Sequence, residues 1–390
     1  MSAAGPVVMR PDLSAMVGYH SPQVDAEVRL NTNESPIAPP GSWSAELARE
    51  IGRIELNRYP DRRARKLREA LASYHDVSPE QVFCANGSNE VIQCLLLAFG
   101  GPGRKALVFE PTYALHSHIA RVTGTGVCSA PRDESFRIDP DAAVSLFGAQ
   151  SPEVTFVCSP NNPTGAAEDP GVVAAIEVAA PGLVVVDEAY GQFARWSALD
   201  LLRDAGPGGH LVVTRTFSKT WAMAGCRLGY LVGTPAVVEA CEAVALPYHL
   251  SSLTQAAGLL ALGYAGEMER RVAAIVEERG RVAAALSGMA VTTWPSEANF
   301  ILLRPDAASS SEVWERLLSQ SVLVRDCSTW PGVEGCLRVT IGTPAENDRF
   351  LEALDSALAG SSPAGSSPAG SSPERSSPER RAPGLNGTPT

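Results

Sequence analysis

Residues 182–190 read GLVVVDEAY, in which four apolar residues run directly into a carboxylate at Asp187. A run that is apolar at every position is typical of a strand buried on both faces, and such strands occur in parallel sheets covered by helices. Similar runs recur along the chain and alternate with helical patterns, which predicts an α/β fold with a mainly parallel sheet. These other runs span residues 81–85, 106–109, 154–158, 211–214 and 228–232.

The chain beyond residue 264 follows a different pattern. A long charged helix is expected over 268–286, and short strands follow around 300–303 and 337–341 with a helix near 312–318 between them. This order predicts a second, smaller α+β domain. The predicted division is an N-terminal segment (1–42), a large domain (43–264), a small C-terminal domain (265–359) and a tail (360–390).

The tail differs from the rest of the chain in composition. Residues 360–390 form a near repeat of AGSSP without an aromatic residue. Such a segment buries too little apolar surface to offset the entropy of ordering it, so we predict that it is disordered.

The charge of the chain argues against polyanionic partners. Its 43 acidic residues outnumber its 32 basic ones, which gives a net charge of −11. Such a protein is not expected to bind nucleic acid or an anionic membrane surface. The apolar runs are shorter than the roughly 18 residues of a membrane span, and the N-terminus lacks the pattern of a secretory signal. We therefore expect a cytoplasmic protein.

Two patterns that could indicate other classes of protein do not fit their context. Residues 101–106 read GPGRKA, a loose dinucleotide fingerprint, but they precede an expected strand where that motif must follow one. His116 and His118 are two residues apart on an expected helix and so point in different directions. We expect them to be structural or surface histidines, and we expect no metal site.

Lysine is scarce in this chain, which makes Lys219 informative. The other lysines are Lys66 and Lys105, and the remaining basic residues are arginine. Lys219 ends the stretch VTRTFSK (213–219), directly after an expected strand, and only an amine can form a Schiff base with a carbonyl cofactor. The alternative is a lysine at a helix start that makes a surface ion pair.

Other polar residues also follow expected strands, where open α/β sheets bind their ligands. Asp187 ends an apolar strand, so its carboxylate needs a cationic partner such as a protonated pyridine nitrogen, unless it is a helix N-cap. Tyr190 could contribute a phenol to the same ligand. The turn CSPNNPTG (158–165) could donate an amide, and ANGSNE (85–90) could hold a phosphate with backbone N–H groups. Ordinary turns and caps remain the alternative.

Together these motifs resemble those of the fold-type-I aminotransferases: NPTG (162–165), DEAY (187–190), SKTW (218–221) and RLGY (227–230). More narrowly, residues 17–358 resemble the histidinol-phosphate aminotransferases. The resemblance implies pyridoxal 5′-phosphate as cofactor, a seven-stranded sheet in the large domain, and a homodimer in which residues 1–42 pack on the small domain and the partner. The narrower match lies in LNTNESP (30–36), RYPD (58–61), LPYHL (246–250), VRD (324–326) and LRVTIGT (337–343).

The resemblance also implies a role for each residue around the cofactor. Lys219 would bind it covalently and then act as general base and acid, while Asp187 would keep the ring nitrogen protonated. Asn162 and Tyr190 would bind the 3′ oxygen, and Tyr113 would stack on the ring. The residues implied for the cofactor phosphate are Ser88, Asn89, Ser218, Arg227 and, from a neighbouring subunit, Tyr59.

Further residues are implied for the substrate. Arg338 would bind the α-carboxylate as a bidentate fork, and Arg325 with Tyr19 would bind the phosphate of the second substrate. Asn33 would contact the substrate as well, although its motif reads NESP where the family usually has NENP.

The implied reaction interconverts L-histidinol phosphate and 2-oxoglutarate with imidazole acetol phosphate and L-glutamate, a step of L-histidine biosynthesis. Two activities on the same scaffold remain open at this point, an aromatic amino-acid aminotransferase and a threonine-phosphate decarboxylase. A cofactor-binding regulator without catalysis is disfavoured, because the full set of motifs is present and no basic DNA-binding segment is attached.

Overall fold

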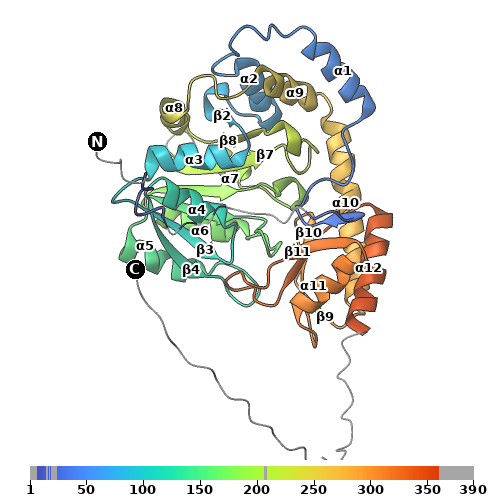
Figure 1. The fold of residues 1–390 in the computed structure, drawn as a ribbon. Coiled ribbons are helices and arrows are strands. Elements are labelled where there is room, and N and C mark those ends of the chain that lie inside the picture. The colour runs from blue at the N-terminus through green and yellow to red at the C-terminus, as the bar shows by residue number, and fades with distance from the viewer. Residues whose placement is uncertain (1–6, 15, 17, 19–23, 206–208, 360–390) are drawn as a thin grey trace, which may run out of the picture.

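The computed structural model describes residues 7–14, 16, 18, 24–205 and 209–359 (Figure 1). Tyr19 and the tail predicted to be disordered, 360–390, lie outside the described residues. The strands are β1 (Val28–Leu30), β2 (Val82–Ala85), β3 (Lys105–Glu110), β4 (Gly126–Pro131), β5 (Val154–Cys158), β6 (Leu183–Asp187), β7 (Leu211–Thr216), β8 (Gly229–Val232), β9 (Val291–Thr293), β10 (Phe300–Pro305), β11 (Val322–Asp326) and β12 (Leu337–Thr340). The α-helices are α1 (Gly41–Ile51), α2 (Arg65–His75), α3 (Ser88–Phe99), α4 (Leu115–Val122), α5 (Pro140–Gln150), α6 (Pro170–Ala179), α7 (Leu199–Ala205), α8 (Pro235–Val244), α9 (Ser252–Leu262), α10 (Ala265–Leu286), α11 (Ser310–Ser319) and α12 (Pro344–Ala359). Short 3₁₀ helices are η1 (Pro79–Gln81), η2 (Gly191–Phe193) and η3 (Ala224–Cys226).

The larger sheet has seven strands in the order β2-β8-β7-β6-β5-β3-β4 within the described residues. They run parallel to one another except β8, which is antiparallel to both of its neighbours. The predicted mainly parallel sheet is therefore confirmed. The sequence does not predict β4, because this edge strand is partly exposed, contains Gly and Pro, and lacks a continuous apolar run.

Helices cover both faces of this sheet because its central strands are apolar on both sides. In β6, Leu183 and Val185 pack in a cluster with side chains of α3, α4 and α8. Val184 and Val186 face the opposite way and pack with side chains of α2, α5, α6, α7 and α9. The alternation of side chains along one strand thus joins two apolar layers through a single sheet.

The smaller sheet has the order β1-β11-β12-β10-β9 within the described residues. Strand β1 joins it parallel to β11, so residues 28–30 belong to this sheet although they precede the larger one in the chain. Its core contains apolar side chains from α10, α11 and α12, such as Val282, Leu317 and Phe350. The sequence predicts β10 and β12 but not β1, β9 or β11, each of which has at most five residues.

The topology brings many strand ends to one edge of the larger sheet. Strands β2, β3, β5, β6 and β7 end at this edge, and β8 begins there because it runs the opposite way. In Figure 1 the smaller sheet, orange and red except for the blue β1, lies with α11 and α12 beside the larger part, and α10 runs alongside both. Within the described ranges, no helix has the length and apolar character needed to cross a membrane.

Candidate active site

A cavity of about 420 Å³ opens between the strand ends of the larger sheet and the smaller sheet. The structure brings most of the predicted site residues together around it. Tyr59 does not line this cavity, and Tyr19 lies outside the described residues. The predicted residues in its lining are Asn33, Ser88, Asn89, Tyr113, Asn162, Asp187, Tyr190, Ser218, Lys219, Arg227, Arg325 and Arg338.

Lys219 enters the cavity from the loop that follows β7. Its Nζ donates a hydrogen bond to the carbonyl oxygen of Thr32 at 3.0 Å. The pKa of the Lys219 amine is lowered to about 7, mainly by burial and further by the nearby Arg338 and Arg227, while Glu34 acts in the opposite direction. A large part of this amine is therefore unprotonated near neutral pH, as a nucleophile requires.

Asp187 ends β6 and is 1% exposed, so its carboxylate lies at the floor of the cavity. One carboxylate oxygen lies 2.9 Å from His116 Nε2, and the other accepts hydrogen bonds from the Thr214 hydroxyl at 3.3 Å and the Ala189 N–H at 3.1 Å. The imidazole of His116 stacks on Phe156 with ring centroids 4.6 Å apart. These contacts fix the orientation of a buried carboxylate that faces a cavity with an amine in its lining.

His116 does not line the cavity and is not among the predicted site residues, but it is in direct contact with one of them. It was expected to be a structural or surface histidine, and it is buried, but it also contacts Asp187. The sequence could have indicated this contact from the position of His116. The residue lies in the first turn of α4, the helix that follows β3 at the edge of the sheet where the site forms. No group of three or more potential metal ligands occurs in the part of the chain that the structure describes.

A row of polar side chains connects the two sheets across the cavity. The Asn33 amide donates to the Tyr190 hydroxyl at 2.9 Å, and the Thr340 hydroxyl donates to Asn33 Oδ1 at 3.0 Å. The Arg338 guanidinium donates to Asn162 Oδ1 and to the carbonyl of Asn31. The residues predicted for the cofactor oxygen and those predicted for the substrate are thus direct neighbours. Burial raises the pKa of the Tyr190 hydroxyl to about 12, which keeps it protonated as a donor.

Opposite this row, the start of α3 forms a cradle with Arg227. No described side chain caps the helix start, which follows Gly87 with its positive φ of 79°. Arg227 donates to the Ser218 hydroxyl at 3.3 Å, and a Cβ added at Gly87 would lie only 2.5 Å from the guanidinium. The absence of a side chain therefore lets the guanidinium approach the helix start. A helix N-terminus and a guanidinium together suit a phosphate dianion.

Two buried arginines lie directly opposite each other on the smaller sheet. Arg325 of β11 pairs in register with Arg338 of β12, and both line the cavity. Each guanidinium lies over an aromatic ring, Arg325 at 5.2 Å from the Trp330 centroid and Arg338 at 5.1 Å from that of Phe300. The two guanidinium groups give this side of the cavity cationic donors that suit anionic groups of a ligand.

Tyr59 lies away from the cavity. It is 80% exposed, and its ring stacks on Tyr248 with centroids 4.5 Å apart. Its implied role in a neighbouring subunit therefore remains a prediction.

Comparison with known proteins identifies the family. The sequence profile of "Aminotransferase class I and II" matches residues 26–354. A histidinol-phosphate aminotransferase of Thermobifida fusca (strain YX) is 48% identical over 362 residues, which cover 90% of this chain and 95% of that protein. The chain belongs to the aminotransferase class I and II family, and within it to the histidinol-phosphate aminotransferases.

Solved structures of this aminotransferase fold agree with the architecture. A histidinol-phosphate aminotransferase of Sinorhizobium meliloti in complex with pyridoxal-5′-phosphate has a TM-score of 0.82 at 22% identity, covering 90% of this chain and 98% of that one. An L-threonine-O-3-phosphate decarboxylase of Porphyromonas gingivalis has a TM-score of 0.74 at 23% identity, covering 85% and 99%. Because an aminotransferase and a decarboxylase share it, this fold alone does not decide the reaction.

Proposed function

We propose that this aminotransferase interconverts L-histidinol phosphate and 2-oxoglutarate with imidazole acetol phosphate and L-glutamate, using pyridoxal 5′-phosphate, in L-histidine biosynthesis. The observation that carries the choice of substrate is the pair Arg325 and Arg338, opposed in register in the same cavity as Lys219. A second guanidinium, Arg325, beside the one assigned to a carboxylate suits a phosphate ester better than the neutral ring of an aromatic amino acid. The 48% identity to the Thermobifida fusca protein supports the same substrate.

The residues present fit the cofactor. Its phosphate would lie at the start of α3 with Ser218 and Arg227, where the two glycines Gly87 and Gly229 leave room for backbone and guanidinium to meet. The Asp187 carboxylate would bind the protonated ring nitrogen. When bound, the cofactor supplies an electron sink for the substrate carbon that carries the amino group.

The chain itself supplies proton transfer and substrate binding. The Lys219 amine would take the proton from the substrate Cα and deliver it to C4′ of the cofactor, which its pKa of about 7 allows near neutral pH. Arg325 binds the phosphate of histidinol phosphate, and Arg338 binds the α-carboxylate of glutamate. The two substrates thus use neighbouring cations in one site, as an enzyme with two alternating half-reactions requires.

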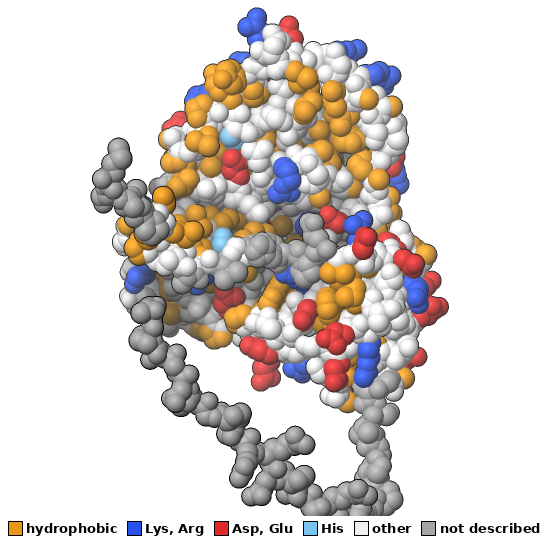
Figure 2. Space-filling model, in the orientation of Figure 1, with side chains coloured by type: hydrophobic (Ala, Val, Ile, Leu, Met, Phe, Trp, Pro, Cys, Tyr) orange, Lys and Arg blue, Asp and Glu red, His pale blue; other side chains and the backbone are white. Residues whose placement is uncertain are grey.

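We also propose that the active form is a homodimer. Tyr59 and Tyr248 form an exposed aromatic pair, and several other large apolar side chains are exposed on the elements around them. Figure 2 shows apolar patches on the upper half of the face in view. Burial of such a patch against a second copy would place Tyr59 near the partner's cofactor phosphate. Among the exposed apolar residues are Leu56, Leu246, Leu253 and Leu259.

The division of the chain and its location are likewise proposals. We propose that residues 43–264 form the large domain and residues 265–359 the small one, with the segment 1–42 packed on the small domain and on the partner. Strand β1 supports this arrangement, since it pairs with β11 of the smaller sheet. We propose a cytoplasmic location, in line with a small polar phosphate ester as substrate.

Half-reactions with single compounds test the function. Purified holoenzyme is mixed separately with histidinol phosphate, glutamate, phenylalanine and threonine phosphate, and the visible band of the cofactor is recorded. We expect histidinol phosphate and glutamate to bleach the band quickly. Fast bleaching by phenylalanine alone would favour the aromatic aminotransferase, and release of carbon dioxide from threonine phosphate would favour the decarboxylase; either result would overturn the proposal.

A variant of Arg325 tests the observation behind the proposal. Arg325→Ala should reduce kcat/KM for histidinol phosphate about 100-fold, because a charge-assisted pair is lost, and it should reduce the slow reaction with phenylalanine much less. Equal losses for the two compounds would show that Arg325 does not recognise the phosphate.

A further inference from the structure

A fully buried ion pair lies next to the site without lining its cavity. Arg132, directly after β4, donates to the Glu168 carboxylate, and both side chains are 0% exposed. Buried ion pairs are seldom more stabilising than well-packed apolar residues, because both charges lose their hydration. The contacts of this pair point to a role other than stability.

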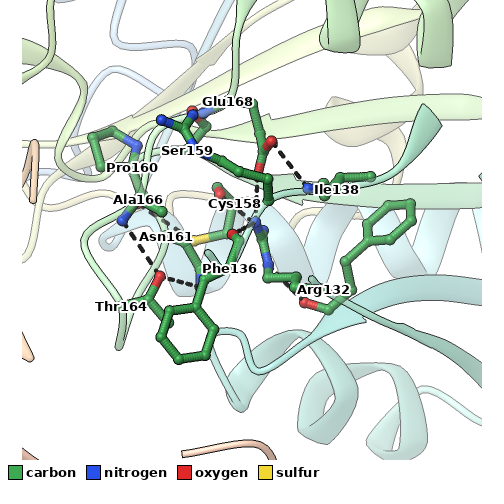
Figure 3. A network of polar contacts seen from close by, with 12 residues as sticks. Arg132, Phe136, Ile138, Cys158, Ser159, Pro160, Asn161, Thr164, Ala166 and Glu168 are labelled. Carbon is green, nitrogen blue, oxygen red and sulfur yellow. Dashed lines mark hydrogen bonds and ion pairs between the residues drawn. The ribbon is translucent and has the colours of Figure 1, made fainter. Parts of the chain in front are cut away.

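Arg132 ties together the ends of two strands and a loop (Figure 3). Its Nε donates to the carbonyl of Phe109 in β3 at 3.1 Å, and its terminal nitrogens donate to the carbonyl of Cys158, the last residue of β5, at 3.2 Å and to that of Phe136 at 3.0 Å. The planar guanidinium thus holds backbone from three segments at fixed distances, which a lysine could not do with the same geometry.

Glu168 closes the base of the turn that follows β5. Its carboxylate accepts the N–H of Ile138 at 3.2 Å, and its own N–H donates to the Ser159 hydroxyl at 2.9 Å. Its carbonyl accepts the indole N–H of Trp196 at 2.6 Å. Residues 159–168 are therefore fastened at both ends, and Asn162 lies within this segment.

Asn161 links the turn after β5 to the segment that contains Tyr113. Its amide donates to the Thr164 hydroxyl within the turn and to the carbonyl of Pro111, each at 2.9 Å. Pro111 lies two residues before Tyr113, which lines the cavity. The turn that carries Asn162 and the segment that carries Tyr113 are therefore held as one unit above the buried pair.

We propose that Arg132 and Glu168 are positioning residues, which fix Asn162 and Tyr113 in the places where they contact the cofactor. This inference rests on the proposed function, since it assigns the pair an effect on a bound cofactor through Asn162. Neither residue touches the cavity, so the effect is transmitted by the backbone of residues 158–168.

The test compares Glu168→Gln with Glu242→Gln. Glu242 belongs to another largely buried ion pair, with Arg68, on α8 and α2, and it does not line the cavity. In the holoenzyme, Glu168→Gln should move the pH midpoint of the cofactor's visible band upward by about 0.5 to 1 pH unit. The reason is that a displaced Asn162 amide withdraws less charge from the 3′ oxygen, which leaves more charge to hold the proton on the Lys219 nitrogen. Glu242→Gln should leave this midpoint at the wild-type value.

Two further measurements separate positioning from mere stability. A double-mutant cycle with Asn162→Ala should show no additional spectral shift when Glu168→Gln is combined with it, because both act through the same amide. Hydrogen exchange of the cofactor-free protein should become faster in residues 138 and 159–168 of Glu168→Gln, without any cofactor or substrate present. The turnover of histidinol phosphate should fall about tenfold in kcat with a smaller change in KM.

Ser159→Ala serves as a second variant if Glu168→Gln fails to fold, because it loosens the base of the turn and leaves the ion pair intact. It should shift the same midpoint in the same direction by a smaller amount. A wild-type midpoint in these variants, together with a thermal destabilisation equal to that of Glu242→Gln, would overturn the proposal and leave the pair a structural role. Failure of the proposed function would instead appear in the wild type, as absence of bleaching by histidinol phosphate.

Discussion

The Lys219 amine should react as a free amine near neutral pH, well below the range of an ordinary lysine. Its pKa is lowered from 10.5 to about 7, first by burial and then by Arg338 and Arg227. At pH 7, about half of the Lys219 amines are therefore unprotonated, compared with about one in 3,000 for a lysine with the ordinary pKa. The unprotonated fraction at pH 7 thus differs by roughly three orders of magnitude.

Trace acylation of the cofactor-free protein measures this directly. A small uncharged acylating reagent is applied between pH 5.5 and 10.5, and the modified peptides are quantified by mass spectrometry. Lys66 and Lys105 are the other lysines of the chain, and both are exposed, so they serve as internal controls. Labelling of Lys219 should rise with a midpoint near pH 7.

Two variants should move the Lys219 midpoint in opposite directions. Arg338→Met removes a cation that lowers the pKa of the Lys219 amine, so the midpoint should rise. Glu34→Gln removes an anion that raises this pKa, so the midpoint should fall. A Lys219 midpoint in the ordinary lysine range near pH 10.5, or a shift of the same sign in both variants, would refute the electrostatic account of the site.

Three further predictions concern stability, cofactor binding and assembly. In the cofactor-free protein, Lys219→Met should raise the free energy of unfolding by roughly 2–5 kcal/mol at pH 7. Between pH 7 and 10.5 the unfolded wild type binds more protons than the folded one, so wild-type stability rises with pH across that range. The gain from Lys219→Met, measured by urea titration, should therefore shrink towards pH 10.5. An equal gain at both pH values would contradict this. Gly229→Ala, whose Cβ would lie 2.3 Å from the backbone of Gly87 and Ser88, should weaken cofactor binding at least about tenfold by equilibrium dialysis, because the start of α3 must move. The control Gly148→Ala, on α5 and away from the cavity, meets nothing within 4 Å and should bind normally. Mixing Tyr59→Ala with Lys219→Ala subunits should restore about a quarter of the wild-type activity if Tyr59 serves the neighbouring site, and none if it serves its own.

The sequence predicts the large sheet well because its central strands are apolar on both faces. Strands β5 and β6 are buried along their whole length, so their apolar runs coincide with the strands to within a residue. The edge strand β4 does not follow this rule, since most of its positions are at least partly exposed. Strand β1 has three residues and is formed by pairing with β11, nearly 300 residues later in the chain, so no local pattern predicts it.

The site residues likewise divide into those that local sequence predicts and those that depend on contacts between distant segments. Asp187 and Lys219 are predictable because each follows a strand that is readable from its own sequence, and the topology brings the strand ends to one edge. The contact of Arg338 with Asn162 joins residues 176 positions apart, and it depends on how the two sheets are placed. The partnership of His116 with Asp187 is equally non-local, which is why this contact was not expected.

The most direct test of the account is to find the residue that binds the cofactor. The holoenzyme is reduced with borohydride, digested, and analysed by mass spectrometry for a peptide that carries the pyridoxyl group. The account predicts a single modified peptide that contains Lys219. A pyridoxyl group on Lys66 or Lys105, or no modified peptide at all from enzyme that shows the visible band, would contradict it.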